Sequence, residues 1–163
     1  IDFGSIWLAL YYLFNFNIST HFVNTLGIIV VVAVCIAAIL FRRRIDIYTM
    51  AFTLVAVFAL VNKVYSPQYW LWLTGLLILS NITLRQFIWW NLAQLGYFVA
   101  IWRYLYYMTQ NSTGTDTAGG VDARTYSYFI LAQWISTLAI VVISVRRSLR
   151  ETESSASAGT LAA

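Results

Sequence analysis

The residues best suited to chemistry lie in one short polar stretch, Asn62-Lys63-Val64-Tyr65-Ser66-Pro67-Gln68-Tyr69, between two apolar segments. The stretch contains the only lysine and the only proline of the chain. An ammonium group is a compact cation that binds phosphate as a point charge, and the neighbouring amides and hydroxyls are neutral donors and acceptors. Because such a stretch interrupts apolar sequence, we expect it at a water interface or around a cavity.

The spacing within this stretch also predicts a helix start. Ser66 is placed to cap a helix, and Pro67 suits its first turn. The first turn of that helix would offer free backbone N–H groups and the positive end of a helix dipole, which attract anions. Together with Lys63 and Asn62, this predicts a binding site for phosphate or pyrophosphate at a bilayer surface. The alternative is a lysine that extends its ammonium to water from an ordinary interfacial turn.

Two further charged residues are candidates on the same side of the predicted bilayer. Arg103 lies roughly 24 Å along a helix that begins near Phe87, so its bidentate guanidinium could join Lys63 around one lipid-linked phosphate; contact with lipid headgroups is the alternative. Asp2 could bind a sugar hydroxyl or act as a base, although a solvated or salt-bridged role is the simpler interpretation. With one histidine and one cysteine, His21 and Cys35, we expect no metal site.

The composition predicts an integral membrane protein. The chain is 61% hydrophobic and 10% charged, whereas soluble domains have about 25% charged residues. The net charge of +4 is therefore interpreted as a topology signal, and we expect membrane lipids rather than nucleic acid as partners.

The apolar runs predict an all-α membrane protein with about five transmembrane helices plus an N-terminal interfacial helix. Residues 1–20 are aromatic and amphipathic and form the expected extracytoplasmic interfacial segment. A transmembrane domain follows over residues 21–147, and a Ser/Ala-rich tail, 148–163, is expected to be disordered and cytoplasmic. The expected spans cover residues 22–41, 45–61, 67–84, 87–108 and 126–145.

The positions of the basic residues predict the orientation of these spans. If Arg42, Arg43 and Arg44 are cytoplasmic, alternation of the spans places seven of the ten basic residues on that side. The N-terminal segment, the Lys63 stretch and the loop at residues 109–125 then share the extracytoplasmic side, and the C-terminus is cytoplasmic. Polar residues inside the last two spans are expected to be interhelical hydrogen-bond partners, with a substrate pathway as the alternative: Asn91, Gln94, Gln133, Thr137 and Ser144.

The stretch from Asn62 to Tyr69, followed by Leu71-Trp72, resembles the late-sequence signature of GT-C type membrane glycosyltransferases. It is similar to that of the catalytic subunit of GPI mannosyltransferase I and of the bacterial glycosyltransferase family 87 enzymes, which use polyprenyl-phosphate mannose. In those families a span ends in an Asn-Lys-Val element, followed by Ser-Pro-Gln-Tyr or a near variant and an aromatic-rich helix. The matching block is about ten residues long, and the alternating short spans agree with it over most of the chain.

The resemblance implies transfer of a sugar, with mannose expected, from a polyprenyl-phosphate donor on the extracytoplasmic face, with inversion at the anomeric carbon. It implies little or no dependence on metal and no cofactor. Lys63 would bind the donor phosphate, Gln68 and Tyr69 would line the donor site, and Asn62 and Ser66 would shape the turn.

The chain departs from the family at its beginning. GT-C enzymes carry their catalytic acid in the first extracytoplasmic loop, and this sequence starts at Ile1 without such a loop. We therefore expect the C-terminal part of an enzyme, or a subunit that a partner membrane protein completes. The alternatives are a non-catalytic flippase or transport subunit for polyprenyl-linked sugars and a structural membrane subunit. The membrane would be the plasma membrane in a bacterium and the endoplasmic reticulum in a eukaryote.

Overall fold

The protein is all-α over the residues that its computed structural model describes, which are 3–80, 82–114 and 119–161, with side chains described up to Ser154. This confirms the predicted fold class at the level of secondary structure. The six helices are α1 (Ile6–Phe14), α2 (Thr20–Phe41), α3 (Ile47–Val61), α4 (Gln68–Leu79), α5 (Leu84–Thr113) and α6 (Ala123–Leu161).

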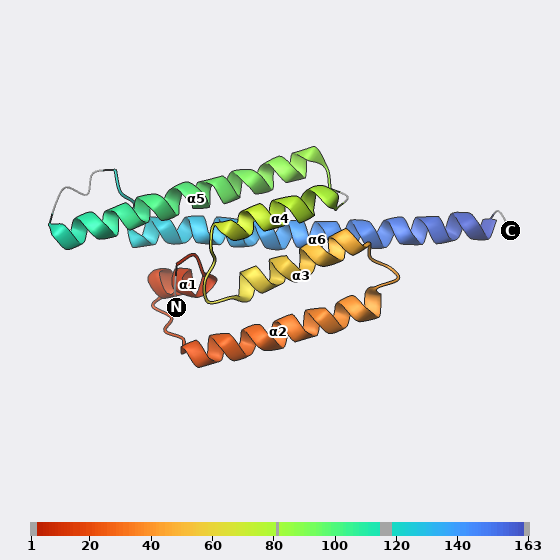
Figure 1. The fold of residues 1–163 in the computed structure, drawn as a ribbon, viewed down its shortest axis with the longest axis horizontal. Coiled ribbons are helices and arrows are strands. Elements are labelled where there is room, and N and C mark those ends of the chain that lie inside the picture. The colour runs from red at the N-terminus through yellow and green to blue at the C-terminus, as the bar shows by residue number, and fades with distance from the viewer. Residues whose placement is uncertain (1–2, 81, 115–118, 162–163) are drawn as a thin grey trace.

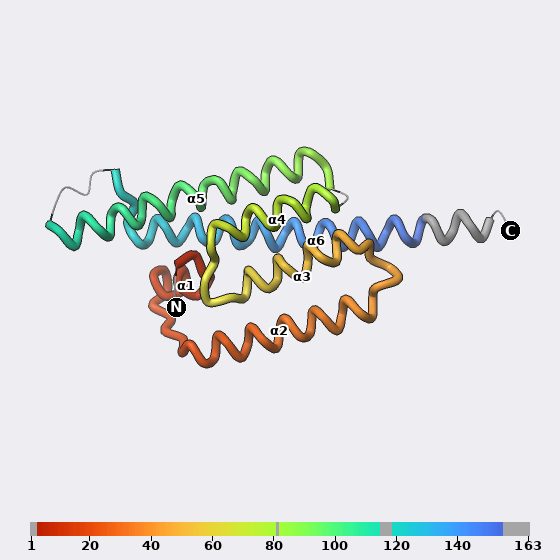
Figure 2. The backbone as a smooth tube through the Cα atoms, viewed as in Figure 1, coloured from red at the N-terminus to blue at the C-terminus, as the bar shows by residue number. Residues whose placement is uncertain are grey.

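From α2 to α6 the helices alternate in direction, so that the loops gather at two ends of the molecule (Figure 1). One end, here called the Lys63 end, contains α1, the start of α2, the α3–α4 loop and the junction of α5 with α6. The opposite end, here called the Arg44 end, contains the α2–α3 loop and the start of α5 (Figure 1). The tube in Figure 2 shows that α2 and α4 run toward this end and that α3 and α5 run away from it. The described parts of the three segments that we expected on one side thus lie at one end (Figure 1), whereas residues 1–2 and 115–118 lie outside the described residues.

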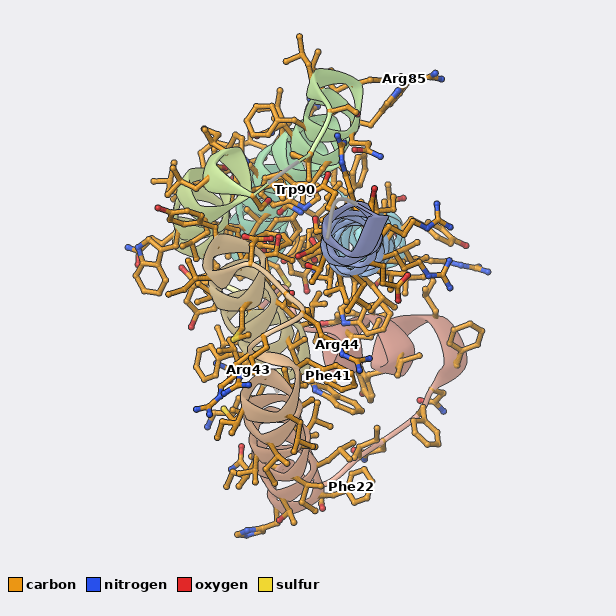
Figure 3. All side chains as sticks on the ribbon, turned by 90° about the vertical axis from the view of Figure 1, so that its right-hand side faces the viewer. Phe22, Phe41, Arg43, Arg44, Arg85 and Trp90 are labelled. Atoms are coloured by element: carbon orange, nitrogen blue, oxygen red, sulfur yellow. The ribbon has the colours of Figure 1, made fainter. Side chains whose placement is uncertain are left out.

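Two groups of buried side chains form the core along α6. The group nearer the Lys63 end joins α1, α3, α5 and α6 and includes Ala59, Tyr65 and Tyr97. The second group joins α3, α4, α5 and α6 and includes Ala56 and Trp90, and Figure 3 shows the Trp90 ring pointing into the bundle.

Helix α2 lies at the edge of the bundle and packs against α3. Val23 is its buried residue, and Gly27 lies close to Val61 of α3, where an added Cβ would meet the carbonyl oxygen at 3.6 Å. Ala33 and Ala37 are exposed, because the face of α2 that meets α3 is the one containing Val23 and Gly27.

Three of the five polar residues predicted to link helices do so among the described residues, namely Asn91, Gln94 and Thr137. Gln94 Nε2 donates to Thr137 Oγ1 at 2.9 Å, which joins α5 to α6, and Trp70 Nε1 donates to Asn91 Oδ1 at 2.9 Å, which joins α4 to α5. The buried amide of Gln133 and the buried hydroxyl of Ser144 have no partner in the described part of the chain.

The helix lengths differ from the predicted spans. Two helices, α2 and the Ala123–Ser154 portion of α6, are long and apolar enough to cross a membrane by length and composition, whereas α3 and α4 are shorter apolar helices. Helix α4 has 12 residues in place of the expected 18, or about 18 Å against roughly 30 Å of hydrocarbon. It ends early because the Ser80 hydroxyl and backbone N–H both bond to carbonyls of its last turn.

At the C-terminal side, α6 extends beyond the expected span end at Val145, so residue 148, the expected start of the tail, lies inside this helix. This extension contacts the α2–α3 loop, because Asp46 N donates to Ser148 Oγ at 2.9 Å and Thr152 Oγ1 donates to Arg44 O at 3.0 Å. Figure 3 looks onto this end, where the labelled Arg85 side chain points away from the bundle.

Asp46 caps α3 at the same end, since its Oδ1 accepts from Tyr48 N and Thr49 N at 3.0 and 2.9 Å. Partial burial alone would raise the pKa of Asp46, but the hydrogen bonds from Thr49, Ser148 and Tyr48 hold it below the usual 3.8. Because the pKa is lower in the folded state, the carboxylate stabilises the fold above about pH 4, and this stabilisation is lost as the pH falls through the folded-state pKa.

We expect Asp46→Ala to lower the free energy of unfolding by about 1 kcal/mol at neutral pH, the usual effect of losing a helix cap. Asp46→Asn keeps an acceptor and is the matched control, with near-native stability at pH 7. Thermal unfolding from pH 7 to pH 3 should show less acid destabilisation of the Asn variant than of the native protein. Equal acid destabilisation of the two proteins would contradict this assignment.

Candidate functional site

The α3–α4 loop is fixed to the rest of the molecule through Tyr65, which is buried. Its backbone N–H donates to Phe3 O at 3.1 Å, and its carbonyl accepts from the Tyr97 hydroxyl at 2.8 Å. Its own hydroxyl donates to Gln94 Oε1 at 3.0 Å, and burial raises the pKa of this phenol. All three polar groups of Tyr65 are therefore bonded, which holds the loop against α5 and the N-terminal segment.

Gly4 allows the N-terminal segment to approach this loop closely. Its φ of 77° is in the left-handed region, and an added Cβ would overlap the Tyr97 hydroxyl and the Tyr65 carbonyl. A side chain at this position would therefore be disfavoured for two reasons: L residues rarely adopt this backbone conformation, and the added Cβ would overlap neighbouring atoms.

The end of α3, immediately before Lys63, is fixed by two indoles from other helices. Trp134 Nε1 of α6 donates to Leu60 O at 3.2 Å, and Trp7 Nε1 of α1 donates to Val61 O at 3.4 Å. These bonds satisfy carbonyls that a helix end otherwise leaves open. Asn62 then turns out of the helix with extended backbone angles.

Lys63 lies at the end of an apolar groove of about 380 Å³ between α2 and α3, here called the Lys63 groove. Valine, isoleucine and phenylalanine side chains, among them Phe58, form most of its wall, and Gly27 leaves it open. Asn24, Asn62 and Lys63 are the residues with polar side chains among those that line it. From Asn24 to Val32 the groove follows α2 for about 12 Å.

This geometry suits an amphiphile with an anionic head. Lys63 is half-buried, and no carboxylate of the described residues forms an ion pair with it. A phosphate bound there would accept from the ammonium and the two asparagine amides, while an attached hydrocarbon chain would lie along the apolar wall.

The other residues of the predicted site are placed differently. Gln68 is exposed, and the Tyr69 ring packs against Tyr65 at 5.7 Å between centroids. The N-cap residue of α4 is Pro67, so Ser66, expected as the cap, lies one position earlier. The wall of the Lys63 groove includes none of the three predicted site residues Ser66, Gln68 and Tyr69.

The start of α4, expected to contribute to an anion site, offers few open donors. The first N–H groups of that helix are occupied, because Gln68 N bonds to Ser66 Oγ, Tyr69 N to Ser66 O and Trp70 N to Pro67 O. Hydrogen-bond donors for an anion at this end of the groove are therefore expected from Lys63 and the two asparagines, not from a helix N-terminus.

Arg103, predicted to join Lys63, is exposed and lies in a separate groove between α5 and α6. Its Nε donates to Gly119 O at 2.8 Å. His21 is exposed in the first turn of α2. Asp2 lies outside the described residues, so the structure places no candidate base there.

Asp122 is a described carboxylate at the Lys63 end. Its Oδ2 accepts from Arg124 N at 3.1 Å and from Thr125 N at 3.4 Å. A hydrogen bond from the Thr125 side chain, and after it these two backbone bonds, hold the pKa of Asp122 below its usual value. A lowered pKa suits a helix cap and disfavours a general base. The described residues contain no group of three or more His, Cys, Asp or Glu side chains that could hold a metal ion.

Three residues that position or line the site were not identified from sequence. Asn24 and Gly27 interrupt the apolar run of α2 three residues apart, a spacing that places them on one helix face. Tyr97 gave no such signal, since it is one of eleven tyrosines.

Comparison with known proteins gave no match to a family model, to a curated protein or to a solved structure.

We expect Gly4→Ala to destabilise the protein by roughly 1–3 kcal/mol, because the new methyl must displace the Tyr65 carbonyl or the Tyr97 hydroxyl at a strained backbone position. The matched control is Gly75→Ala in α4, where a Cβ meets nothing within 4 Å and the better helix propensity of alanine applies. Thermal unfolding of both variants measures the difference. A Gly4→Ala protein as stable as the Gly75→Ala protein would contradict the packing described for this segment.

Proposed function

We propose that this chain is the C-terminal membrane portion of a GT-C type glycosyltransferase, which transfers a sugar, mannose by resemblance, from a polyprenyl-phosphate donor at the extracytoplasmic face. The observation that supports the proposal most is the Lys63 groove. It combines one half-buried ammonium, two asparagines and an apolar trench, which are complementary to a phosphate joined to a hydrocarbon chain. The proposed type of donor, a polyprenyl-phosphate sugar, comes from the resemblance of the Asn-Lys-Val and Ser-Pro-Gln-Tyr elements to the GT-C signature.

The surface of the bundle supports a position in a membrane. Helix α2 has about 33 Å of length and presents large exposed apolar side chains, including Ile28, Ile29, Ile36 and Leu40. Exposed apolar surface of this extent is typical of membrane or protein contacts. Seven arginines lie at the Arg44 end or on the adjoining part of α6, which favours a cytoplasmic position for that end.

In this proposal Lys63 has a binding and an electrostatic role. It holds the donor phosphate, and it stabilises the charge that grows on the departing phosphate oxygen as the sugar–oxygen bond breaks. Asn62 and Asn24 would orient the same phosphate by donating from their amides. The base that accepts the proton of the acceptor hydroxyl comes from outside the described residues.

A second candidate function is a non-catalytic carrier of polyprenyl-linked sugars. Buried polar side chains on α5 and α6 favour it, because polar groups at membrane depth often mark a transport path: Gln94, Gln133, Thr137 and Ser144. None of them lines the Lys63 groove, so the carrier would need a conformation in which these two helices separate.

We expect Lys63→Ala to abolish most sugar transfer by the full-length protein while its amount in the membrane stays normal. Loss of a charge-assisted hydrogen bond of about 1.5–3 kcal/mol corresponds to roughly 10- to 100-fold weaker donor binding. The assay is transfer of labelled mannose from polyprenyl-phosphate mannose in isolated membranes.

The matched control is Arg124→Ala, which removes one exposed positive charge at the same end of the molecule and should leave transfer unchanged. Near-native transfer by the Lys63→Ala protein would contradict the proposed enzyme. Translocation of the lipid in reconstituted vesicles, without any transfer, would identify the carrier instead.

A further inference from the structure

A second open groove, here called the Arg103 groove, follows the seam between α5 and α6. It has a volume of about 580 Å³, and its wall is apolar except for Arg103 and Thr125 near one end. From Leu92 to Arg103 it extends along α5 for about 16 Å. Gly96 leaves room against the Phe129 ring, which an added Cβ would meet at 3.4 Å.

The backbone and side chain of Arg103 are both held at the end of this groove. Its carbonyl accepts from Val121 N at 3.2 Å, and its Nε donates to Gly119 O at 2.8 Å. The guanidinium plane is therefore fixed by the α5–α6 loop, and its four other N–H donors lie on the two terminal nitrogens. A terminal pair of this kind matches two oxygens of a phosphate.

The Arg103 groove is separate from the Lys63 groove, since the two share no lining residue and lie between different helices. Both cations nevertheless belong to the Lys63 end of the bundle, because Lys63 lies in the α3–α4 loop and the Tyr104 hydroxyl, next to Arg103, bonds to that of Tyr12 in α1 at 2.9 Å. Trp102, beside Arg103, is 58% exposed, and an exposed indole next to a cation is typical of the headgroup level of a bilayer.

We propose that the Arg103 groove binds an anionic phospholipid, with one acyl chain along the α5–α6 seam and the phosphate at the guanidinium. The proposal rests on the membrane position proposed above and is independent of sugar transfer. Charge complementarity selects the occupant, because Arg103 is the one charged side chain among the described residues that line the groove. A cation at the mouth of an apolar trench favours a lipid with net negative charge over a zwitterionic one, whose own cationic group is repelled.

The test is native mass spectrometry of the delipidated, detergent-solubilised protein titrated with phosphatidylglycerol and, separately, with phosphatidylcholine. We expect tighter binding of phosphatidylglycerol. Arg103→Gln should weaken that binding about tenfold or more, the loss expected for one charge-assisted contact. Gly96→Leu should weaken it as well, because the leucine fills the groove while Arg103 remains.

A matched variant controls for charge. Arg124→Gln removes an exposed cation at the same end, outside both grooves, and should bind phosphatidylglycerol normally. Polyprenyl phosphate should bind more weakly to the Lys63→Gln protein and normally to the Arg103→Gln protein.

Unchanged phosphatidylglycerol binding by both the Arg103→Gln and the Gly96→Leu proteins would overturn the inference, as would equal affinity of the native protein for the two phospholipids. Loss of polyprenyl phosphate binding in the Arg103→Gln protein would also overturn it, because one shared site would then explain both lipids. Normal polyprenyl phosphate binding by the Lys63→Gln protein would count against the proposed function and leave the Arg103 groove to be judged on phosphatidylglycerol alone.

Discussion

The arrangement at the Lys63 end depends on the full set of hydrogen bonds around Tyr65. Its N–H, carbonyl and hydroxyl bond to Phe3, Tyr97 and Gln94, which come from an N-terminal segment and a helix far apart in sequence. A buried polar group without a partner costs about 1–3 kcal/mol, so moving this loop would break several favourable bonds together. Tyr65 lies two residues after Lys63, and the fixed loop therefore limits where the ammonium can lie.

Two grooves of the bundle have the same kind of lining. Each joins an apolar wall formed by two neighbouring helices to one cation at the Lys63 end, Lys63 between α2 and α3 and Arg103 between α5 and α6. Their positions differ because α2 packs against α3 at the edge of the bundle, whereas α5 packs against α6. The sequence suggested one phosphate shared by both cations, whereas the structure places Lys63 and Arg103 in separate grooves.

The helical class, the alternation of directions and the grouping of three segments at one end followed from apolar runs and arginine positions. The early end of α4 was not predicted from the sequence. Thr83 and Gln86 form a capping box at the start of α5, and a Thr followed three residues later by Gln is a spacing that marks a helix start. The face that α2 turns toward α3 is decided by tertiary packing, so the place of Asn24 beside Lys63 was not predictable from periodicity in a helix that is apolar all round.

The central claim, that a lipid phosphate binds at Lys63 with its hydrocarbon chain between α2 and α3, is tested most directly by photolabelling. A polyprenyl phosphate with a photoreactive group on its first isoprenoid units would be bound in vesicles, and the labelled peptides identified by mass spectrometry. The account predicts crosslinks concentrated on residues 24–32 of α2 and 58–63 of α3. Crosslinks confined to α5 and α6, or spread evenly over the lipid-facing surface, would contradict it.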